Sequence, residues 1–210
     1  MTKTSSQSEY QYASSQLDHT YNYLTTPLLT MLPPPSGREI KILDLGCGNG
    51  SFSNFLTKLG YKVLGIEESS AGIAIAQQNY PDCEFRQGSI YDLSGSDLQH
   101  NFDAVISVEV IEHLSNPRAL VTAAKYCLKP EGKFILTTPY HGYLKNLALA
   151  VSGKMDDHFT AVWDGGHVKF FSVPTLTQLL ITENCTDIQF KYAGRIPYLW
   201  KSMLCTCKVN

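Results

Sequence analysis

The chain has 210 residues, of which 17 are basic and 19 are acidic, and its net charge is −2. A hydrophobic content of 43% is typical of a folded globular protein and excludes wholesale disorder. The near-neutral charge disfavours a nucleic-acid binder that depends on bulk positive charge. No segment approaches the ~20 apolar residues of a membrane helix, and the polar N-terminus does not resemble a signal peptide. We therefore expect one cytoplasmic domain over residues 1–210, as a monomer or homodimer, with no transmembrane segment.

The cysteines are spread along the chain, and none forms a C-x-x-C pair. A thiolate zinc site is therefore not expected, and buried thiols are the preferred interpretation. The residues concerned are Cys47, Cys83, Cys127, Cys185, Cys205 and Cys207.

In chain order, residues 9–32 carry spaced Tyr and Leu residues that predict one or two amphipathic helices. Prolines 33–35 then break the chain. From residue 38 strands and helices alternate, which predicts an α/β doubly wound, mostly parallel sheet with helices on both faces. Strands are predicted at 40–45, 62–66, 84–87, 102–108, 132–137, 188–192 and 203–209, and helices at 51–59, 69–78, 116–128 and 173–181. Ligands bind such sheets at the carboxyl ends of the strands.

Four segments of this domain are expected to differ in role. Residues 1–37 would form an N-terminal helical lid, and residues 38–140 a cofactor-binding core. Residues 141–172 form a long connection after the fifth strand, which predicts a substrate cap, because long connections in compact domains are usually functional. Within this cap, the apolar stretch 144–151 lacks a basic face, so burial is preferred to contact with a membrane surface. Residues 173–210 would complete the domain with a helix and a strand pair.

A glycine-rich loop follows the first predicted strand, at residues 44–50. Ser51 stands where a dinucleotide fingerprint needs a third glycine, and the Gly-Lys-Ser/Thr of a phosphate-binding P-loop is absent. Asp44 precedes the first glycine, where it would repel a pyrophosphate but suit a cationic ligand. The loop therefore favours a positively charged small molecule over a dinucleotide.

Further segments follow in a fixed order: Glu67 at the end of the second strand, Gly88-Ser89-Ile90 after the third, residues 107–114 after the fourth, and 128–133 before the fifth. Together with D-L-G-C-G-N-G they resemble the class I S-adenosylmethionine-dependent methyltransferases over residues 38–140. The resemblance implies a Rossmann-like seven-stranded fold in which the acidic residue holds the ribose and the third-strand segment contacts the adenine. The cofactor-binding residues it implies are Asp44, Gly46, Cys47, Gly48, Asn49, Gly50, Glu67, Glu68, Gly88, Ser89, Ile90, Ser107 and Val108.

Methyl transfer to a hydroxyl requires that the hydroxyl lose its proton. Four histidines follow the fourth and fifth strands, and His113 and His167 are the predicted catalytic bases. A metal is the alternative, because Glu109, Glu112 and His113 would share one face if the segment were helical. A divalent ion such as Mg²⁺ would then acidify the acceptor.

The E-x-x-E-H segment and the later G-G-H-V-K-F segment are similar to the ubiquinone-pathway 3-O-methyltransferase branch. That similarity makes His167 a fourth metal-ligand candidate. The glutamate–histidine pair also suits a metal-free loop that orients substrate, so both interpretations stay open.

A small-molecule acceptor is the expected partner, and O-methylation the expected reaction. N-methylation of an amine, RNA 2′-O-methylation and a non-catalytic cofactor-binding protein are the alternatives, and the small number of basic residues counts against RNA. In the loops, Arg195 would pair with a substrate carboxylate. The predicted substrate-binding residues are Tyr21, Glu109, Tyr140, His141, Trp163 and Arg195.

Overall fold

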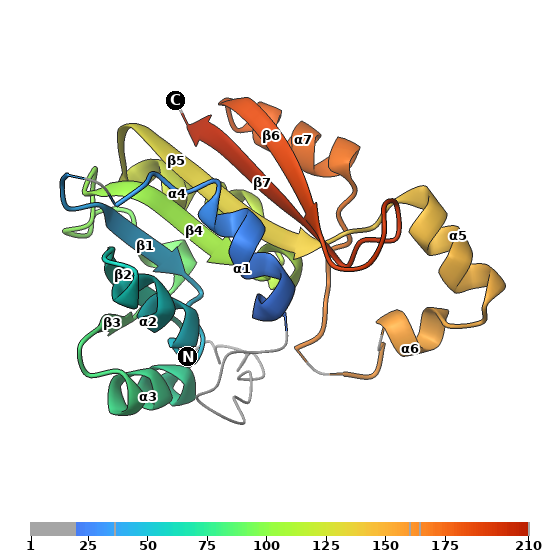
Figure 1. Ribbon diagram of the computed structural model, residues 1–210, viewed down its shortest axis with the longest axis horizontal. Helices are drawn as coiled ribbons and strands as arrows, with labels where there is room; N and C mark the ends of the chain where they lie inside the picture. The colour runs from blue at the N-terminus through green and yellow to red at the C-terminus, as the bar shows by residue number, and fades with distance from the viewer. Residues whose placement is uncertain (1–19, 36, 160, 164, 210) are drawn as a thin grey trace, which may run out of the picture.

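The computed structural model describes residues 20–35, 37–159, 161–163 and 165–209 (Figure 1). Its centre is a seven-stranded sheet with the strand order β3-β2-β1-β4-β5-β7-β6. β1 to β5 run parallel, whereas β7 is antiparallel to both of its neighbours. The strands are β1 (Lys41–Leu45), β2 (Lys62–Glu67), β3 (Glu84–Gln87), β4 (Phe102–Val108), β5 (Leu128–Pro139), β6 (Cys185–Ala193) and β7 (Ser202–Val209). The predicted α/β doubly wound sheet is confirmed.

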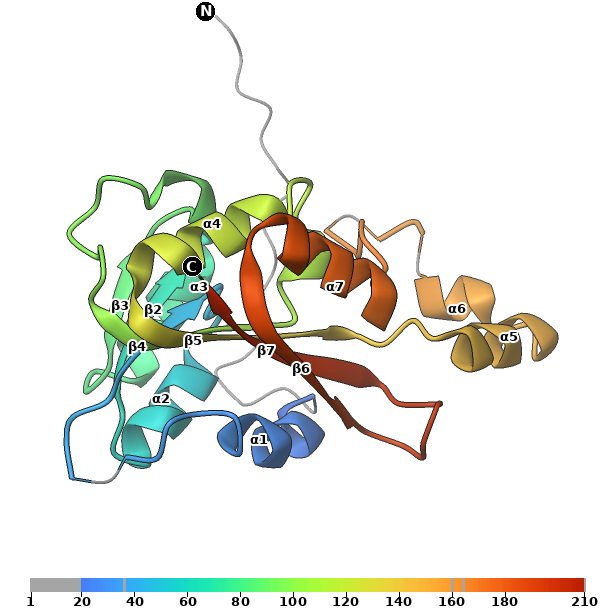
Figure 2. The ribbon, with the colours of Figure 1, turned by 90° about the horizontal axis from the view of Figure 1, so that it is seen from above.

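Helices cover both faces of this sheet (Figure 2). α1 and α2 pack on one face, and α4 and α7 on the other. The helices are α1 (Tyr21–Leu29), α2 (Ser51–Lys58), α3 (Ser70–Asn79), α4 (Arg118–Cys127), α5 (Tyr143–Val151), α6 (Met155–Phe159) and α7 (Val173–Thr182), with 3₁₀ turns η1 (Ile90–Asp92) and η2 (Ile111–His113). The expected lid helix is thus a single helix in the described part, and the predicted helical segment at 9–19 lies outside the described residues.

The central strands are buried on both faces because their side chains alternate between two hydrophobic clusters. On β1, Ile42 packs toward α1 and α2, while Leu43 and Leu45 pack toward α4 and α7. On β4, Ile106 and Val105 divide in the same way. This arrangement fixes where β1 and β4 end, and therefore where the loops after them meet.

The predicted burial of residues 144–151 is wrong. They form α5, which extends beyond the end of β5 together with α6 (Figures 1 and 2). Leu144, Leu147 and Val151 are 56%, 59% and 81% exposed. The reason is that α5 stands away from the sheet and packs chiefly on α6, so no larger element covers its apolar face.

The cysteines are all free thiols, and five of them are buried, as expected; Cys83 is half-buried. In the described ranges, no helix has both the length and the apolar character to span a membrane.

Candidate active site

The glycine loop turns sharply between β1 and α2. Gly46, Gly48 and Gly50 have φ values of +78°, +58° and +76°, a backbone region that favours glycine. The N–H groups of Gly46 and Cys47 both donate to the carbonyl of Ile66, at 2.8 and 3.0 Å, and so fasten the loop to β2. A Cβ on Gly50 would lie 2.6 Å from the Phe85 ring. The loop is therefore held close to the neighbouring strands, with its backbone at the carboxyl edge of the sheet.

The carboxylate of Glu67 braces this loop. Its Oε2 accepts a hydrogen bond from the Gly48 N–H at 3.0 Å, and its Oε1 accepts one from the Ser69 N–H at 2.9 Å. The side chain is only 9% exposed. Glu67 therefore fixes the glycine loop relative to the start of α3, and the two predicted cofactor-binding segments come together.

Asp44 lies beneath the loop rather than at its surface. Its side chain is 2% exposed, and Oδ2 accepts a hydrogen bond from Ser53 Oγ at 2.7 Å. Burial raises the pKa of Asp44 to about 7, with the Ser53 hydrogen bond opposing and the negative charge of Glu67 adding to the shift. In this structure Asp44 thus holds the first turn of α2, which follows the glycine loop, through its hydrogen bond with Ser53.

Two further predicted residues stabilise the same edge. Asn49 Oδ1 accepts a hydrogen bond from the Ser51 N–H at 3.1 Å at the start of α2. Ser107 Oγ donates to the Leu45 carbonyl at 2.9 Å and ties the end of β4 to β1. Val108, the last residue of β4, is buried beside it. The side chains of Asn49 and Ser107 therefore bond to the protein itself.

The segment after β3 also lies at this edge. The Gly88 N–H donates to the Glu67 carbonyl at 3.0 Å. Ser89 Oγ accepts from the Tyr91 N–H at 3.4 Å and begins η1, whose first residue is Ile90. Glu68 is exposed beside it. The predicted adenine-contact segment is thus adjacent to the end of β2.

Glu109 follows β4 in a left-handed conformation, with φ of +55°. Such a conformation costs roughly 1 kcal/mol or more for a residue other than glycine. It directs the carboxylate to β5 and β7: Oε1 accepts from Thr137 Oγ1 at 2.8 Å, and Oε2 from Ser202 Oγ at 3.3 Å. Ser202 Oγ lies 3.4 Å from the hydroxyl of Tyr23 on α1. Glu109 therefore links the carboxyl end of β4 to β5 through Thr137 and to β7 through Ser202.

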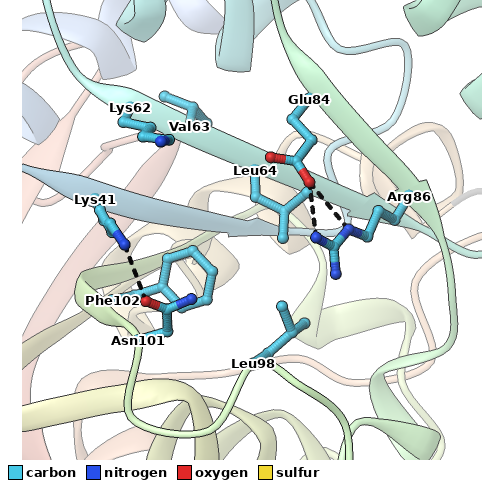
Figure 3. A pocket seen from close by; sticks show the side chains of 9 residues that line it. All are labelled: Lys41, Lys62, Val63, Leu64, Glu84, Arg86, Leu98, Asn101 and Phe102. Carbon is cyan, nitrogen blue, oxygen red and sulfur yellow. Dashed lines mark hydrogen bonds and ion pairs between the residues drawn. The ribbon is translucent and has the colours of Figure 1, made fainter.

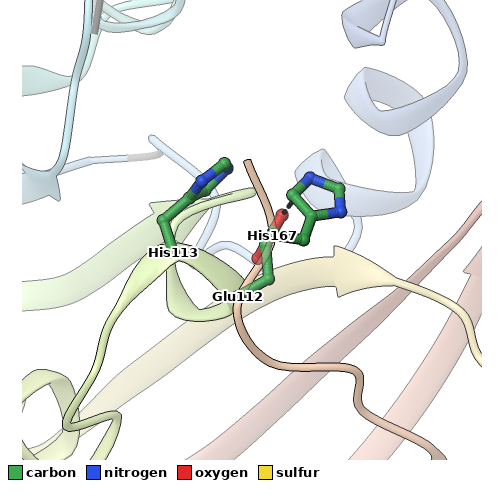
Figure 4. Close-up of side chains that lie close together, drawn as sticks. All are labelled: Glu112, His113 and His167. Carbon is green, nitrogen blue, oxygen red and sulfur yellow. Dashed lines mark ion pairs between the residues drawn. The ribbon is translucent and has the colours of Figure 1, made fainter. Parts of the chain in front are cut away.

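Glu112, His113 and His167 form a compact cluster after β4, with one candidate ligand atom from each lying within 4.8 Å of the others (Figure 4). Glu112 is 1% exposed; Oε2 accepts from Thr138 Oγ1 at 3.0 Å. Glu112 Oε1 makes no hydrogen bond, and it lies 4.0 Å from His167 Nε2. The rings of His113 and His167 meet edge to face at 4.9 Å.

Backbone hydrogen bonds bring His167 to this place. The Glu112 carbonyl accepts from the N–H groups of Val168 and Lys169, both at 2.9 Å. His113 Nδ1 lies 2.9 Å from the Gly165 carbonyl. The loop before α7 is thus fastened to η2, which is why residues distant in the sequence share one cluster.

Burial favours the neutral forms of the side chains in this cluster. It raises the pKa of Glu112 well above the ordinary value, and the negative charge of Glu109 adds to the effect. It lowers the pKa of His113, and it lowers that of His167 to about 4, with the nearby His113 adding to the shift. Both imidazoles are therefore able to accept a proton near neutral pH.

The predicted four-ligand metal set is not brought together. The helical turn begins only at Ile111, so Glu109 does not share a face with Glu112 and His113. The described side chains that lie close enough to share a metal ion are Glu112, His113 and His167, and Glu109 is not among them. Two imidazoles and one carboxylate are donors that suit Zn²⁺, Fe²⁺ or Mn²⁺. Mg²⁺ prefers oxygen ligands, so this donor set does not fit the expected Mg²⁺.

His141 lies in an aromatic cluster beside the active-site edge. It is 7% exposed, and its ring centroid lies 5.5, 5.9 and 5.1 Å from those of His158, Phe159 and Phe170. Neither ring nitrogen makes a hydrogen bond of acceptable geometry. Burial lowers its pKa to about 4, and the charge of Lys145 adds to the shift.

The remaining predicted substrate residues are dispersed. Tyr21 stacks on Phe52 of α2 at 4.8 Å. Tyr140 meets two other rings edge to face after β5, whereas Trp163 is 48% exposed in the loop before α7. Arg195 is exposed, with φ of +62°, between β6 and β7.

Sequence reasoning missed four polar residues that support the site: Ser53, Thr138, Lys145 and Ser202. All except Lys145 are small hydroxyl residues in ordinary helix or strand patterns, so only tertiary contacts distinguish them. Lys145 is 4% exposed, although it lies on a helix whose other face is open. Its position among apolar residues in 144–151 was the available signal.

Shallow cavities of about 170 and 180 Å³ lie elsewhere. The first is at the amino ends of β1 to β4, lined by Lys41, Lys62, Glu84 and Phe102 among others (Figure 3). Arg86, which also lines it, is already paired with Glu84 at 2.8 Å. Neither cavity contains the clustered histidines or the glycine loop.

The sequence matches the family described as a methyltransferase domain over residues 17–189. The chain belongs to this methyltransferase family. The resemblance to class I S-adenosylmethionine-dependent methyltransferases of the ubiquinone O-methyltransferase-like branch is confirmed.

Relatives of this methyltransferase domain include three proteins named ubiquinone biosynthesis O-methyltransferase. The protein from a Bradyrhizobium species is 30% identical over 170 residues, which are 74% of this chain and 64% of the relative. The protein from Azorhizobium caulinodans is 30% identical over 120 residues, which are 55% of this chain and 46% of the relative. The mitochondrial protein of Schizosaccharomyces pombe is 33% identical over 105 residues, which are 47% of this chain and 37% of the relative. The chain spans about half the length of the curated relatives it matches.

Solved structures agree in fold. A SAM dependent methyltransferase from Archaeoglobus fulgidus has a TM-score of 0.64 at 14% identity, covering 88% of this chain and 92% of that chain. The magnesium protoporphyrin IX methyltransferase of Synechocystis, solved with bound SAH, has a TM-score of 0.64 at 16% identity, covering 88% and 79%. These likenesses show the Rossmann-like methyltransferase fold.

Proposed function

We propose that this domain transfers a methyl group from S-adenosylmethionine to a hydroxyl group of a small molecule. The family supports the donor, and the relatives' names support the hydroxyl acceptor. The observation that carries the proposal is the pair formed by Glu112 Oε1 and His167 Nε2, 4.0 Å apart at the carboxyl end of the sheet. An amine acceptor is already nucleophilic when neutral, whereas a hydroxyl needs such a pair to remove its proton.

The glycine loop fits the methyl donor. Its backbone can approach a ligand closely, because Gly46, Gly48 and Gly50 carry no side chain that would cover it. The Glu67 carboxylate, held by the Gly48 and Ser69 N–H groups, is placed to accept hydrogen bonds from ribose hydroxyls. When bound, S-adenosylmethionine supplies an electrophilic methyl group on a positively charged sulfur.

In this mechanism His167 accepts the proton of the acceptor hydroxyl while the oxygen attacks the methyl carbon. The pKa of His167, about 4, keeps the imidazole neutral at pH 7, so its ring nitrogen is unprotonated when the acceptor binds. The backbone carbonyl of Glu112 holds the loop after His167 in position through the N–H groups of Val168 and Lys169, and Thr138 holds the Glu112 carboxyl through the hydrogen bond to Oε2. Orienting the acceptor in line with the methyl group can contribute about 7–11 kcal/mol.

A metal at Glu112, His113 and His167 is the second mechanism that an observation favours. The unpartnered Oε1 of Glu112 and the short separations of the three donors support it. His113 would bind through Nε2, since its Nδ1 lies at the Gly165 carbonyl. A transition metal ion would supply a Lewis acid that lowers the acceptor's pKa.

Donor binding is tested by calorimetry with S-adenosylhomocysteine on the purified chain. Glu67→Gln should weaken binding by about tenfold or more, because a carboxylate oxygen that accepts is replaced by an amide that donates. Glu39→Gln is the matched control, since Glu39 is an exposed glutamate before the amino end of β1, and this variant should bind normally. Absence of binding to the unmodified chain contradicts the proposal.

Acceptor class is tested with labelled S-adenosylmethionine and a panel of paired hydroxyl and amine compounds on the same ring systems, with a short RNA included. The proposal predicts label in the hydroxyl compounds. Label only in the amines would establish N-methylation instead, and label only in RNA would establish the nucleic-acid alternative. Donor binding without any transfer would favour the non-catalytic alternative.

A further inference from the structure

Lys145 is a buried cation without a carboxylate partner. The side chain is 4% exposed, and Nζ donates to the carbonyls of Tyr140 at 2.7 Å and Lys201 at 3.4 Å. Among the described residues it forms no ion pair. An ammonium has three donors, so these two carbonyls leave one N–H unused. Burying a charge without an opposite charge is costly, which indicates that something else at this position compensates it.

Arg195 brings a second positive charge to the same place. It follows Gly194, whose carbonyl accepts from the N–H of Lys201 at 3.3 Å, and Lys145 donates to the carbonyl of the same Lys201. In the described part of the chain its guanidinium has no hydrogen bond or ion pair. Its charge contributes to lowering the pKa values of Lys145, to about 8, and of His158.

These cations adjoin the acceptor side of the proposed active site. The Lys201 carbonyl, which Lys145 contacts, also accepts from the Tyr140 N–H at 2.9 Å. The next residue, Ser202, donates to Glu109 Oε2. Glu109 is the nearby carboxylate that raises the pKa of Lys145, but its effect is smaller than the opposing effect of Arg195. Positive charge is therefore in excess beside Glu109.

We propose that Lys145 and Arg195 form an anion subsite, and that the methyl acceptor carries a carboxylate. The unused N–H of Lys145 would donate to one carboxylate oxygen, and the guanidinium of Arg195 would hold the group from the solvent side through its planar fork. This inference rests on the proposed function, because it assigns the substrate class of the same active site.

The test compares two compounds that differ only in charge, 3,4-dihydroxybenzoate and 3,4-dihydroxybenzamide. Each is titrated by calorimetry into the full chain saturated with S-adenosylhomocysteine at pH 7. The acid should bind about tenfold more tightly than the amide, and added salt should reduce the difference. Binding of S-adenosylhomocysteine is measured first, so that a failure of the donor site is recognised separately.

Arg195→Gln should reduce the preference for the acid to about threefold or less, and because Arg195 is exposed this variant should fold. Lys145→Met should have a similar effect, with circular dichroism as the check on α5. Lys154→Gln is the matched control, because Lys154 is an exposed cation just after α5, and it should leave the preference unchanged.

Equal binding of acid and amide to the unmodified chain, or no binding of the acid while S-adenosylhomocysteine binds, would overturn the anion subsite and leave the proposed function intact. A preference that survives both Arg195→Gln and Lys145→Met would overturn the assignment to these residues.

Discussion

Glu112 Oε1 lies 4.0 Å from Nε2 of His167, and this contact joins the turn after β4 to the loop before α7. The carboxyl is fully buried and held on its other oxygen by Thr138. The Glu112 carbonyl also accepts hydrogen bonds from the N–H groups of Val168 and Lys169, so His167 is fixed at the edge where the glycine loop also lies, although the intervening chain passes through β5 and the α5–α6 segment.

We expect His167→Gln to lower kcat by about 100-fold or more, because the variant side chain cannot accept the hydroxyl proton as a base. Glu112→Gln should cost about tenfold or less, since Glu112 Oε1 makes no hydrogen bond and lies 4.0 Å from His167 Nε2. Steady-state kinetics measures both. S-adenosylhomocysteine affinity should stay unchanged in each variant, and a larger loss in Glu112→Gln than in His167→Gln would argue against His167 as the base.

Removal of divalent metals should leave activity within about twofold if a neutral histidine is the base. The measurement is turnover after dialysis against EDTA, with metal content determined before and after. Activity that disappears with EDTA and returns with Zn²⁺, Fe²⁺ or Mn²⁺, and fails to return in Glu112→Gln, would show the metal mechanism instead. Recovery with Mg²⁺ alone would contradict the inference that two imidazoles and one carboxylate do not suit Mg²⁺.

His141→Phe should stabilise the fold by about 1 kcal/mol at pH 7, because it replaces two buried ring nitrogens that make no hydrogen bonds. The gain should grow on acidification. The pKa of His141 is lowered from 6.5 to about 4, so the unfolded chain binds more protons in this window and the histidine costs stability as the pH falls from 6.5 toward 4.

The predicted additional gain for His141→Phe is about 1–2 kcal/mol between pH 6.5 and 4, read from urea unfolding. Comparing the variant with the unmodified chain at each pH cancels the opposite contributions of Asp44 and Glu112. His100→Phe is the contrast: His100 Nδ1 bonds to the Leu128 carbonyl at 2.8 Å, so this change should destabilise. A pH-independent difference for His141→Phe would refute the argument.

Gly50→Ala should lower the free energy of unfolding by about 2–4 kcal/mol. Its φ is +76°, and an added Cβ would lie 2.6 Å from the Phe85 ring and 2.7 Å from Ala76 Cβ. Gly153→Ala shares the positive φ but has nothing within 4 Å, so it should cost only about 1 kcal/mol. Chemical denaturation measures both, and equal losses would show that the close packing under the loop contributes nothing.

The sequence predicted the core of this fold well because its local patterns agree with its tertiary structure. Each of the seven predicted strands overlaps an observed strand, and Glu84–Gln87 and Phe102–Val108 have the predicted limits. The places of Asp44 and Glu67 near the ends of β1 and β2 were also predicted, since both strands are buried on both faces, whereas their roles in binding the donor stay predictions.

What was missed depends on contacts between distant segments. The left-handed conformation of Glu109 separates it from Glu112, and its neighbours Thr137 and Ser202 come from β5 and β7. The exposure of α5 was missed because an apolar stretch indicates burial only where another element covers it. Lys145 donates hydrogen bonds to the residue after β5 and to the residue before β7, and helical spacing can reveal neither contact.

The position of β7 between β5 and β6 has a consequence for how the chain acquires its structure. β6 is synthesised before β7, yet in the described sheet it is joined to β5 only through β7. Ser202, which contacts Glu109, is the first residue of β7. The hydrogen bond from Ser202 to Glu109 therefore forms only after β7 has left the ribosome, so the contacts around Glu109 are completed later in synthesis than those of the glycine loop.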